Sequence, residues 1–541
     1  MAVPVREKGP LPPVIEAMLK PEFYPHPVTD IELRQTHTSY VLLAGEFAYK
    51  VRKAVRFAFI DCSTAARRSA LCWRELELNR RLSPDVYLGV VAIVQSGGQF
   101  ILDQSTDDPA NAMEFAVKMR RLPQDRRLDL LIKRDAATAE NIREIAKTIG
   151  SFHANTPNTH SWAYGAAASI WRMAIDNLIE IEQLGPDTPL LKKIAQIEAY
   201  SRHYIAAHWE LLNRRAHEGR IHEGHGDLRA DAVYLTSSGL RIIDCLEFDE
   251  RLRYGDIANE VAFLAMDIER LGRPDLSHEL IAHSISDPDI ALLIPFYKSY
   301  RAMVRAKVEL LRSRQEDCGA EDKQTALASA AHLLDLALDY AQGPKALLIV
   351  CGASGTGKST LAAVLSEHLA FDIFSSDMMR KRLAGVEPNT PAAAPYNQGI
   401  YTPEFTSRVY ASLLAEAKRV LNIGKGVILD ATFGKRSQRQ LAIETAKQAH
   451  AEPLFIECRA GKDVVIRRLS ERVQDSQRVS DATVEIYLTQ IEEFEPLDEV
   501  PSAWHQMVDT THDLAALAFE IERRVYSTQY SSMRSQEPAQ E

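Results

Sequence analysis

The chain has 541 residues, a formal net charge of −10 at pH 7, 46% hydrophobic residues and 26% charged residues. This length favours about three domains of ~150 residues over a single core. The composition is typical of a soluble globular protein, and the acidic balance argues against a general binder of nucleic acid or of anionic membranes.

The cysteines and the first residues indicate the compartment. The six cysteines are scattered, with no Cys-x-x-Cys pair and no metal-ligand spacing, so we expect buried thiols in a reducing compartment. The opening stretch, MAVPVREKGPLPP, lacks the apolar segment of a signal peptide. No apolar run approaches the ~20 residues that span a bilayer. The sequence therefore predicts a cytoplasmic protein with no membrane partner.

The first part of the chain reads as a small sheet followed by helices. Residues 1–30 are rich in proline and predict an irregular lead-in. The stretch HTSYVLLAGEFAYKVRK, after Thr36, has two apolar runs around a glycine turn and predicts a β-hairpin. Helical periodicity over 65–82 follows Ser63, which we expect to be the N-cap. The strand-like runs VYLGVVAIV and QFILD come next, and the pattern over 112–225 is mostly helical.

The second part of the chain has a different pattern of predicted elements. Helical periodicity runs to about residue 341, where the breaker Gln-Gly-Pro at 342–344 marks a domain boundary. Beyond it, the apolar runs ALLIVC, GVILD and PLFIEC alternate with helical segments, which indicates a parallel sheet. One helix is expected to begin at Thr402, with a proline in its first turn, and to end near Gly424.

These features divide the chain into five segments. The predicted segments are an irregular lead-in (1–30), a kinase-like N-lobe (31–110), a helical C-lobe (111–342), a P-loop domain (343–525) and a polar, disordered tail (526–541).

The stretch GASGTGKS over 352–359 matches the pattern G-x-x-x-x-G-K-[ST] between a strand and a helix. Glycines let such a backbone wrap phosphates, and the helix N-terminus points its N–H groups at the anion. Lys358 is expected to reach the β- and γ-phosphates of ATP, and Ser359 to hold Mg²⁺. A glycine-rich turn without a ligand is the alternative. The residues predicted to bind the nucleotide are Gly352, Ser354, Gly355, Thr356, Gly357, Lys358, Ser359 and Thr360.

Two acidic positions follow the loop. Asp377 and Arg380 lie three residues apart at the start of a predicted helix, so they face the same way. A carboxylate there accepts the proton of an attacking hydroxyl, and the arginine neutralises phosphate charge. The alternative is an Asp N-cap followed by a solvated arginine. Asp430 ends the run GVILD, a Walker-B-like position suited to Mg²⁺ or its water.

An arginine-rich stretch, RRLSERVQDSQR, lies near the end of the P-loop domain. It is either a solvated face or a lid that closes over phosphates, and Arg472 is its candidate for nucleotide binding. Its arginines are Arg467, Arg468, Arg472 and Arg478.

Together, GASGTGKS, SSDMMRKRL, VILDAT and this stretch resemble the P-loop kinase family that includes polynucleotide kinases and zeta-type toxins, over about 343–525. The resemblance implies that Asp377 is the general base and that Arg380 binds an acceptor or donor phosphate.

The stretch HGDLRADAVYL, followed by LRIIDCLEFD, resembles the aminoglycoside phosphotransferase family, a branch of the protein-kinase fold. The resemblance implies that Asp227 orients or deprotonates an acceptor hydroxyl and that Asp244 is a metal ligand. It implies that His225 braces the loop. Lys50 on a strand and Glu75 on the next helix have the order of the kinase Lys–Glu ion pair.

The same loop departs from the family pattern. Ala232 stands where such loops carry a metal-binding Asn, and Arg229 replaces a common His. Asp231 is a candidate substitute ligand because carboxylates suit Mg²⁺, and the hairpin offers only Gly45 in place of a glycine-rich loop. Three readings stay open: an active kinase that uses Asp231, a slow kinase with one metal, and a nucleotide-sensing pseudokinase.

Phrases such as YKVRKAVRFAFIDCST and DCLEFDERLRYGD resemble bacterial two-module proteins known as bifunctional aminoglycoside phosphotransferase/ATP-binding proteins. The fold class expected is therefore multidomain, with an α+β protein-kinase-like module followed by an α/β P-loop kinase of three layers. The leading hypothesis is an ATP- and Mg²⁺-dependent phosphotransferase whose C-terminal module acts on a hydroxyl acceptor.

The acceptor is expected to be a small molecule. A nucleic-acid 5′ end is the alternative, but no row of aromatic residues suited to base stacking accompanies the lid arginines. A polycationic drug requires a strongly acidic cleft, which the diffuse net charge does not demonstrate. Two other functions remain: a regulatory protein that binds nucleotide as a switch, and a P-loop ATPase in which Asp377 only caps a helix.

Overall fold

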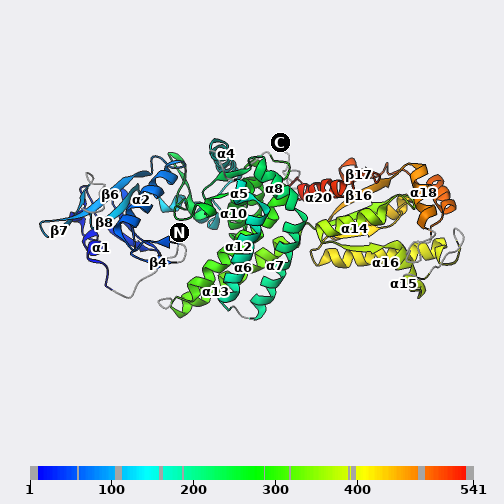
Figure 1. Ribbon diagram of the computed structural model, residues 1–541, viewed down its shortest axis with the longest axis horizontal. Coiled ribbons are helices and arrows are strands. Elements are labelled where there is room, and N and C mark those ends of the chain that lie inside the picture. The colour runs from blue at the N-terminus through cyan, green and yellow to red at the C-terminus, as the bar shows by residue number, and fades with distance from the viewer. Residues whose placement is uncertain are drawn as a thin grey trace. The chain divides into compact units, whose positions relative to one another are not determined.

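The structure, a computed structural model, describes residues 10–57, 60–103, 112–156, 162–185, 188–284, 287–315, 319–387, 390, 398–472 and 482–531. The chain forms two compact units, Met1–Ala341 and Gln342–Glu541 (Figure 1). Each unit has its own sheet and its own hydrophobic clusters.

The first unit begins with an antiparallel sheet in the order β1-β2-β3-β8-β6-β7. Its strands are β1 (Ile31–Gln35), β2 (Ser39–Ala44), β3 (Phe47–Arg52), β6 (Tyr87–Ser96), β7 (Gln99–Asp103) and β8 (Glu114–Arg120). The β2–β3 hairpin confirms the prediction, and Gly45 supplies the positive φ of 59° that its turn requires. The helix α2 (Ala65–Arg80) packs Cys72 and Leu76 on one face of the sheet.

Two predictions for this region were wrong. The lead-in of 1–30 contains α1 (Pro13–Met18) and the 3₁₀ turn η1 (Pro21–Phe23), because Ile15 and Met18 cover the second face of the sheet. The segment predicted to be mostly helical from about 112 opens with β8, so the N-lobe extends beyond the predicted boundary at residue 110. A short, fully buried apolar run cannot be assigned to strand or helix from its periodicity, and the neighbours β3 and β6 decide it.

The remainder of the first unit is mostly helical. Its helices are α3 (Leu128–Lys133), α4 (Ala139–Asn155), α5 (Trp162–Gly165), α6 (Ala167–Gln183), α7 (Thr188–Ala207), α8 (Trp209–His217), α9 (Glu250–Arg253), α10 (Ile257–Arg270), α11 (Pro274–Ser284), α12 (Ile290–Ser313) and α13 (Ala320–Ala341). The short elements are η2 (Gln124–Arg126), η3 (Ala230–Ala232), β4 (Arg56–Phe57), β5 (Ile60–Asp61), β9 (Ile221–Glu223), β10 (Val233–Thr236), β11 (Gly239–Ile242) and β12 (Tyr254–Asp256).

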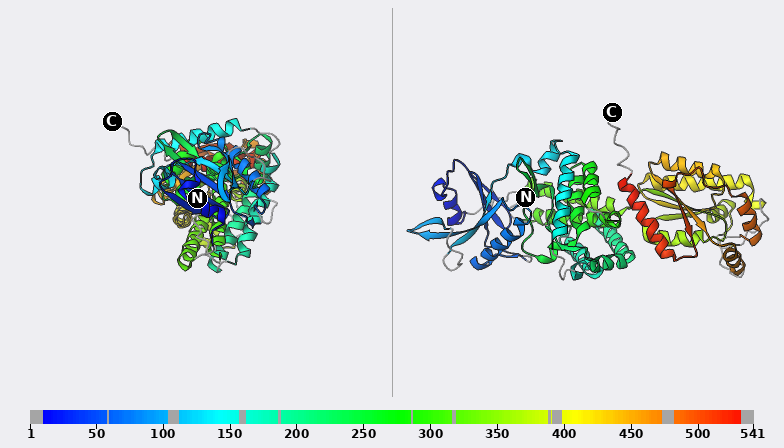
Figure 2. Two further views of the ribbon diagram at one scale, coloured as in Figure 1. Left: turned by 90° about the vertical axis from the view of Figure 1, so that its left-hand side faces the viewer. Right: turned by 90° about the horizontal axis from the view of Figure 1, so that it is seen from above.

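Four of these helices, α6, α7, α12 and α13, form a bundle around one cluster of buried side chains (Figure 2). Within the same unit, the hairpin of β10 and β11 joins the HGD loop to Asp244. A small antiparallel sheet followed by a helical lobe is the protein-kinase-like architecture, and this part of the fold prediction is confirmed.

The second unit is built on a parallel sheet in the order β14-β15-β13-β16-β17. Its strands are β13 (Ala346–Cys351), β14 (Asp372–Ser375), β15 (Val427–Asp430), β16 (Glu452–Arg459) and β17 (His505–Asp509). Its helices are α14 (Lys358–Leu369), α15 (Ser376–Ala384), α16 (Pro403–Asn422), α17 (Arg436–Gln448), α18 (Lys462–Arg472), α19 (Val484–Glu493) and α20 (Leu514–Ser531), with 3₁₀ turns η4 (Gly399–Tyr401) and η5 (Ser502–Trp504).

Helices cover both faces of this sheet (Figure 1). In β13, Leu347 and Ile349 pack in the cluster of α16 and α17, while Leu348 and Val350 point to the other face and are also fully buried. Burial on both faces explains the continuous apolar runs of the sequence. The predicted three-layer P-loop unit is confirmed, and so is the helix expected from Thr402, which is its N-cap.

The expected disordered tail begins too early at 526, because α20 continues to Ser531 with Val525 and Tyr526 buried. The rest of the tail lies outside the described residues. Within the described part of the chain, no helix is both long and apolar enough to cross a membrane.

Candidate functional site

The P-loop joins β13 to α14, as the sequence predicted. Gly352 and Gly357 have φ angles of 131° and 88°, a region that favours glycine. Space also requires them: a Cβ on Gly352 would lie 2.5 Å from the Cys458 carbonyl oxygen, and one on Gly357 would lie 2.9 Å from Oγ1 of Thr510. Gly355 has a φ of 82° as well. The loop backbone therefore has the shape that presents N–H groups to phosphates.

Side chains inside the loop hold its first turn. Oγ1 of Thr356 and Nζ of Lys358 both donate to the carbonyl oxygen of Ala353, each at 2.8 Å. The hydroxyl of Thr510 donates to the carbonyl oxygen of Thr356 at 2.6 Å, and Arg468 donates to Oγ1 and to the carbonyl of Thr510 at 3.1 and 3.0 Å. Thr510, which follows β17, was missed by sequence reasoning because it lies in no motif.

The helices α18 and α19 also contact the P-loop. Oε1 of Gln490 on α19 accepts a hydrogen bond from the backbone N–H of Ser354 at 2.8 Å. Val465 and Leu469 of α18 and Tyr487 of α19 pack against Ala353. Gln490 was also missed, since a lone glutamine on a helix has no recognisable signature.

The arginine-rich stretch is only partly within the described residues. Arg467 is exposed and Arg468 contacts Thr510. Arg472 is the last residue of α18, and its side chain lies outside the described residues, as does Arg478. Ser359 and Thr360 are exposed in the first turn of α14.

Asp377 and Arg380 lie on α15, directly after β14. The hydroxyl of Ser375 caps this helix by accepting from the N–H of Met378 at 3.3 Å, so the cap is Ser375 and the alternative role of Asp377 as a capping residue was wrong. Asp377 is half-buried, while Arg380 has only 6% of its surface exposed. A carboxylate and a buried guanidinium therefore occupy the same helical turn.

The Arg380 side chain contacts residues at the start of α16 and just before it. Its Nη1 donates to the carbonyl oxygen of Ile400 at 2.6 Å and to Oγ1 of Thr406 at 3.1 Å, and its guanidinium lies 4.7 Å from the centre of the Tyr401 ring. Among the described residues, no atom accepts from its buried Nε. Burial lowers the pKa of Arg380, against the opposing charge of Asp377. A phosphate or carboxylate oxygen can accept a hydrogen bond from such a group.

Asp430 ends β15 and is buried, with 6% of its surface exposed. Its register neighbours are Val350, two residues before the P-loop, and Ser375, two residues before Asp377. The described residues contain no group of three or more His, Cys, Asp or Glu side chains suited to a metal. Mg²⁺ in kinases is bound by one or two protein oxygens with phosphates and waters, and Ser359 with Asp430 fits that pattern.

The first unit brings its predicted site residues together. Nζ of Lys50 on β3 lies 2.8 Å from Oε1 of Glu75 on α2 and 2.9 Å from Oδ1 of Asp244, 194 positions away. The Lys50 charge holds the pKa of Asp244 well below its usual range. The backbone N–H of Asp244, whose φ is 69°, donates to the hydroxyl of Tyr87 at 3.1 Å.

A second cation extends this network. Arg52, two residues after Lys50 and on the same face of β3, binds both Glu75 and Glu247, with Nη2 2.6 Å from Oε1 of Glu247. Arg52 and the two glutamates are buried. Burial raises the pKa of Glu247, and Arg52 opposes this effect. Sequence reasoning missed Arg52 and Glu247, although the alternation of Lys50 and Arg52 was a usable signal.

The HGD loop carries an arginine between two aspartates. Nε of Arg229 lies 3.2 Å from each carboxylate oxygen of Asp227, and Nη1 lies 3.1 and 3.2 Å from the oxygens of Asp231. Asp231, the predicted substitute for the missing metal ligand, is paired with Arg229 in this structure. Ala232 closes the turn η3.

His225 is buried below the loop. Its Nε2 lies 3.0 Å from the carbonyl oxygen of Ile243, and its backbone N–H donates to Glu260. Burial lowers the pKa of His225, which favours the neutral ring. These contacts, to Ile243 just before Asp244 and to Glu260 on α10, agree with the bracing role that the resemblance implies.

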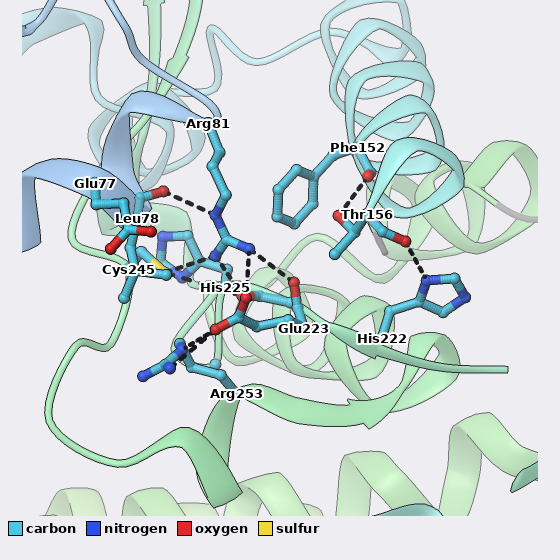
Figure 3. Close-up of polar contacts among 12 residues, drawn as sticks. Glu77, Leu78, Arg81, Phe152, Thr156, His222, Glu223, His225, Cys245 and Arg253 are labelled. Atoms are coloured by element: carbon cyan, nitrogen blue, oxygen red, sulfur yellow. Dashed lines mark hydrogen bonds and ion pairs between the residues drawn. The ribbon is translucent and has the colours of Figure 1, made fainter. Parts of the chain in front are cut away.

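The segment before the HGD loop is fastened to the end of α2 (Figure 3). Arg81 donates to the carbonyl oxygens of Glu223 and Gly224, each at 3.0 Å, and its guanidinium lies 5.0 Å from the Phe152 ring centre. Nη2 of Arg253 lies 2.9 Å from Oε1 of Glu223. These contacts tie the helix that carries Glu75 to the strand that leads into the loop.

Comparison with known proteins gives relatives for the whole chain and for each unit. Residues 347–497 match the family described as AAA domain. The chain is 34% identical over 472 residues to the uncharacterized proteins Rv2004c of Mycobacterium tuberculosis and Mb2027c of Mycobacterium bovis, covering 85% of this chain and 90% of each relative.

Solved structures with a detectable likeness include three kinases. A choline/ethanolamine kinase family protein from Mesorhizobium loti is 12% identical, covering 61% of this chain and 97% of its own, with a TM-score of 0.34. A microcompartment-associated aminopropanol kinase is 17% identical, covering 60% and 96%, with a TM-score of 0.37. A gluconokinase from Sinorhizobium meliloti is 19% identical, covering 36% and 98%, with a TM-score of 0.26.

Proposed function

This chain belongs to the same family as the uncharacterized protein Rv2004c of Mycobacterium tuberculosis, and we propose that its C-terminal unit transfers phosphate from ATP to a hydroxyl group. One observation carries the proposal: the P-loop, Asp430 and Asp377 follow the carboxyl ends of three adjacent parallel strands, β13, β15 and β14. Ligands of open α/β sheets bind at that edge. The P-loop, Asp430 and Asp377 therefore lie at one edge of the sheet, which supports a shared site.

Each residue has a defined part in the proposed reaction. The P-loop N–H groups and Lys358 bind the β- and γ-phosphates, and Lys358 exchanges its present bond to Ala353 for a phosphate oxygen. Mg²⁺ bound by Ser359 and Asp430 would neutralise phosphate charge. Asp377 takes the proton of the acceptor hydroxyl while the acceptor oxygen bonds to the γ-phosphorus. The bond from that phosphorus to the bridging oxygen breaks, and ADP leaves.

Arg380 supports an anionic partner in the acceptor subsite. Its buried Nε lacks an acceptor among the described residues, and Asp377 lies one turn before it. A phosphate of the donor or of the acceptor satisfies such a group with a charge-assisted hydrogen bond. We favour a small-molecule acceptor, with a nucleic-acid 5′ end as the alternative.

The layout of two units also supports the predicted resemblance to bifunctional aminoglycoside phosphotransferase/ATP-binding proteins. We do not propose an aminoglycoside as the substrate.

The described cysteines, Cys62, Cys72, Cys245, Cys351 and Cys458, are free and buried. Free thiols support a reducing compartment, and we place the protein in the cytoplasm.

The test is ATP turnover together with ³²P transfer to a panel of metabolites and oligonucleotides. Lys358→Ala and Asp377→Asn are each expected to lose transfer by roughly 100-fold or more, the range of a lost general base or phosphate ligand. Asp372→Asn changes an exposed carboxylate on β14, the strand that precedes Asp377, and is expected to keep wild-type transfer.

Two results would redirect the assignment. ATP hydrolysis that survives Asp377→Asn, with no acceptor labelled by the wild type, indicates a P-loop ATPase. Transfer that survives Lys358→Ala but is abolished by Asp227→Ala assigns catalysis to the N-terminal unit.

A further inference from the structure

The HGD loop of the N-terminal unit contains a buried positive charge, Arg229, three residues before the position where a metal ligand is missing. In kinases of this fold, the catalytic-loop Asn and the Asp after the next strand each hold one Mg²⁺. Ala232 has no donor atom for a metal. Arg229, only 9% exposed, contacts both oxygens of Asp227 and both oxygens of Asp231 at 3.1 to 3.2 Å.

Several carboxylates surround Arg229, with Arg305 as a second cation nearby. Asp244 and Asp267 add to the negative field around it: burial lowers the pKa of Arg229, but Asp227, Asp267 and Asp244 outweigh this effect and raise it. Asp267 is itself fixed, because it accepts from the backbone N–H of Ala230 at 2.9 Å. A guanidinium stays charged at every physiological pH.

A divalent ion does not fit this position. It would have to displace the Arg229 side chain from two carboxylates and then remain beside its positive charge. The side chain of Ala232 would offer the ion no ligand atom. Asp244 differs, because its carboxylate is half-exposed and, among the described residues, forms one ion pair, with Lys50 at 2.9 Å. Asp244 would hold a metal ion that accompanies the nucleotide, since a carboxylate is a ligand that Mg²⁺ prefers.

We propose that Arg229 is a built-in cation that replaces the catalytic-loop metal, so that the N-terminal unit binds ATP with a single Mg²⁺ held at Asp244. This site is separate from the P-loop site of the C-terminal unit. The ion pair to Arg229 also occupies the carboxylate of Asp227, the residue that would accept a proton. The N-terminal unit is therefore a nucleotide-binding unit whose transfer chemistry is suppressed.

The proposal is tested by counting metal ions in the full-length chain. Lys358→Ala with Ser359→Ala silences the P-loop and gives the parent protein. Bound Mn²⁺ is measured by electron paramagnetic resonance with saturating adenylyl-imidodiphosphate. The parent is expected to bind one Mn²⁺, and adding Asp244→Ala is expected to reduce the count to zero. Two ions or none in the parent, or an ion that persists after Asp244→Ala, would overturn the proposal.

A gain-of-metal variant tests the role of Arg229 itself. Arg229→Gln with Ala232→Asn removes the cation and restores a ligand, and the count is expected to rise from one to two. Arg241→Gln is the matched control: it removes an arginine paired with Asp85 at 2.7 Å on the neighbouring hairpin, and should leave one ion. A folded Arg229→Gln/Ala232→Asn protein that still binds one ion contradicts the proposal. If that variant does not fold, the number of Mn²⁺ ions bound by the parent protein decides whether the proposal stands.

Discussion

Thr510 donates its hydroxyl to the carbonyl oxygen of Thr356 at 2.6 Å, although 154 positions separate the two residues. Thr510 has 4% of its surface exposed and receives two hydrogen bonds from Arg468. It therefore connects the strand at one edge of the sheet, β17, to the P-loop next to Gly357. The shape of the nucleotide loop depends on a residue outside every recognised motif.

Thr510→Ala should weaken ATP binding about 5- to 30-fold, equivalent to ~1–2 kcal/mol, because the buried carbonyl of Thr356 loses its donor. Isothermal titration of ATP measures the change. Thr510→Ser keeps the hydroxyl and should stay within twofold of the wild type. Equal losses in both variants would mean that the methyl group, rather than the hydrogen bond, supports the loop.

Gln490→Ala should tighten ATP binding by about 2- to 10-fold, the size of one net hydrogen bond. The reason is competition: Oε1 of Gln490 accepts from the Ser354 N–H, a donor that the phosphates require. Thr489→Ala is the control, since Oγ1 of Thr489 only bonds within α19 to the carbonyl of Glu485 at 3.2 Å. Weaker binding by Gln490→Ala would show instead that Gln490 holds the bound nucleotide.

Arg52→Met should destabilise the N-terminal unit by ~3–5 kcal/mol, because it leaves Glu247 and Glu75 buried without their shared partner. Arg52→Met with Glu247→Met should recover more than half of the loss, as replacement of both charges by apolar groups removes the unpaired carboxylate. Thermal unfolding measures the stability of the single and of the double variant. Arg56→Met, at a largely exposed pair with Asp61, should change little. A double variant as unstable as Arg52→Met would contradict the argument.

Glu260 makes the HGD loop sensitive to acid. Burial by itself raises its pKa, but hydrogen bonds from His153 and from the His225 N–H lower it to about 2, below its ordinary 4.5. A carboxyl with a lowered pKa stabilises the fold fully above pH ~4.5 and loses that contribution as the pH falls towards 2.

Glu260→Gln should therefore be less stable than the wild type near pH 7, and the gap in unfolding free energy should narrow by about 2 kcal/mol between pH 6 and 3. Urea unfolding at several pH values measures this gap. Glu144→Gln, at an exposed position on α4, should follow the wild type at every pH. A gap independent of pH would show that Glu260 is not ionised in the folded protein.

Much of the fold was predictable because its signals are local. The P-loop needs glycine where φ is positive, and its flanking strand and helix have distinct patterns. The Lys50, Glu75, Asp227 and Asp244 positions were found from their order and their motifs. In contrast, β8 fell within a segment predicted to be mostly helical, because a short buried apolar run acquires its identity only from the strands beside it.

The sequence alone determined the two-unit organisation, the loop that wraps phosphates and the missing ligand at Ala232, since each depends on residue type at fixed local spacing. Only the tertiary structure decided which side chains meet. It joined Thr510 to Thr356, Arg52 to Glu247 and Arg229 to two aspartates at once. These contacts depend on how distant or sharply turned segments pack, and the energy of a buried charge is set by the neighbours that packing brings to it.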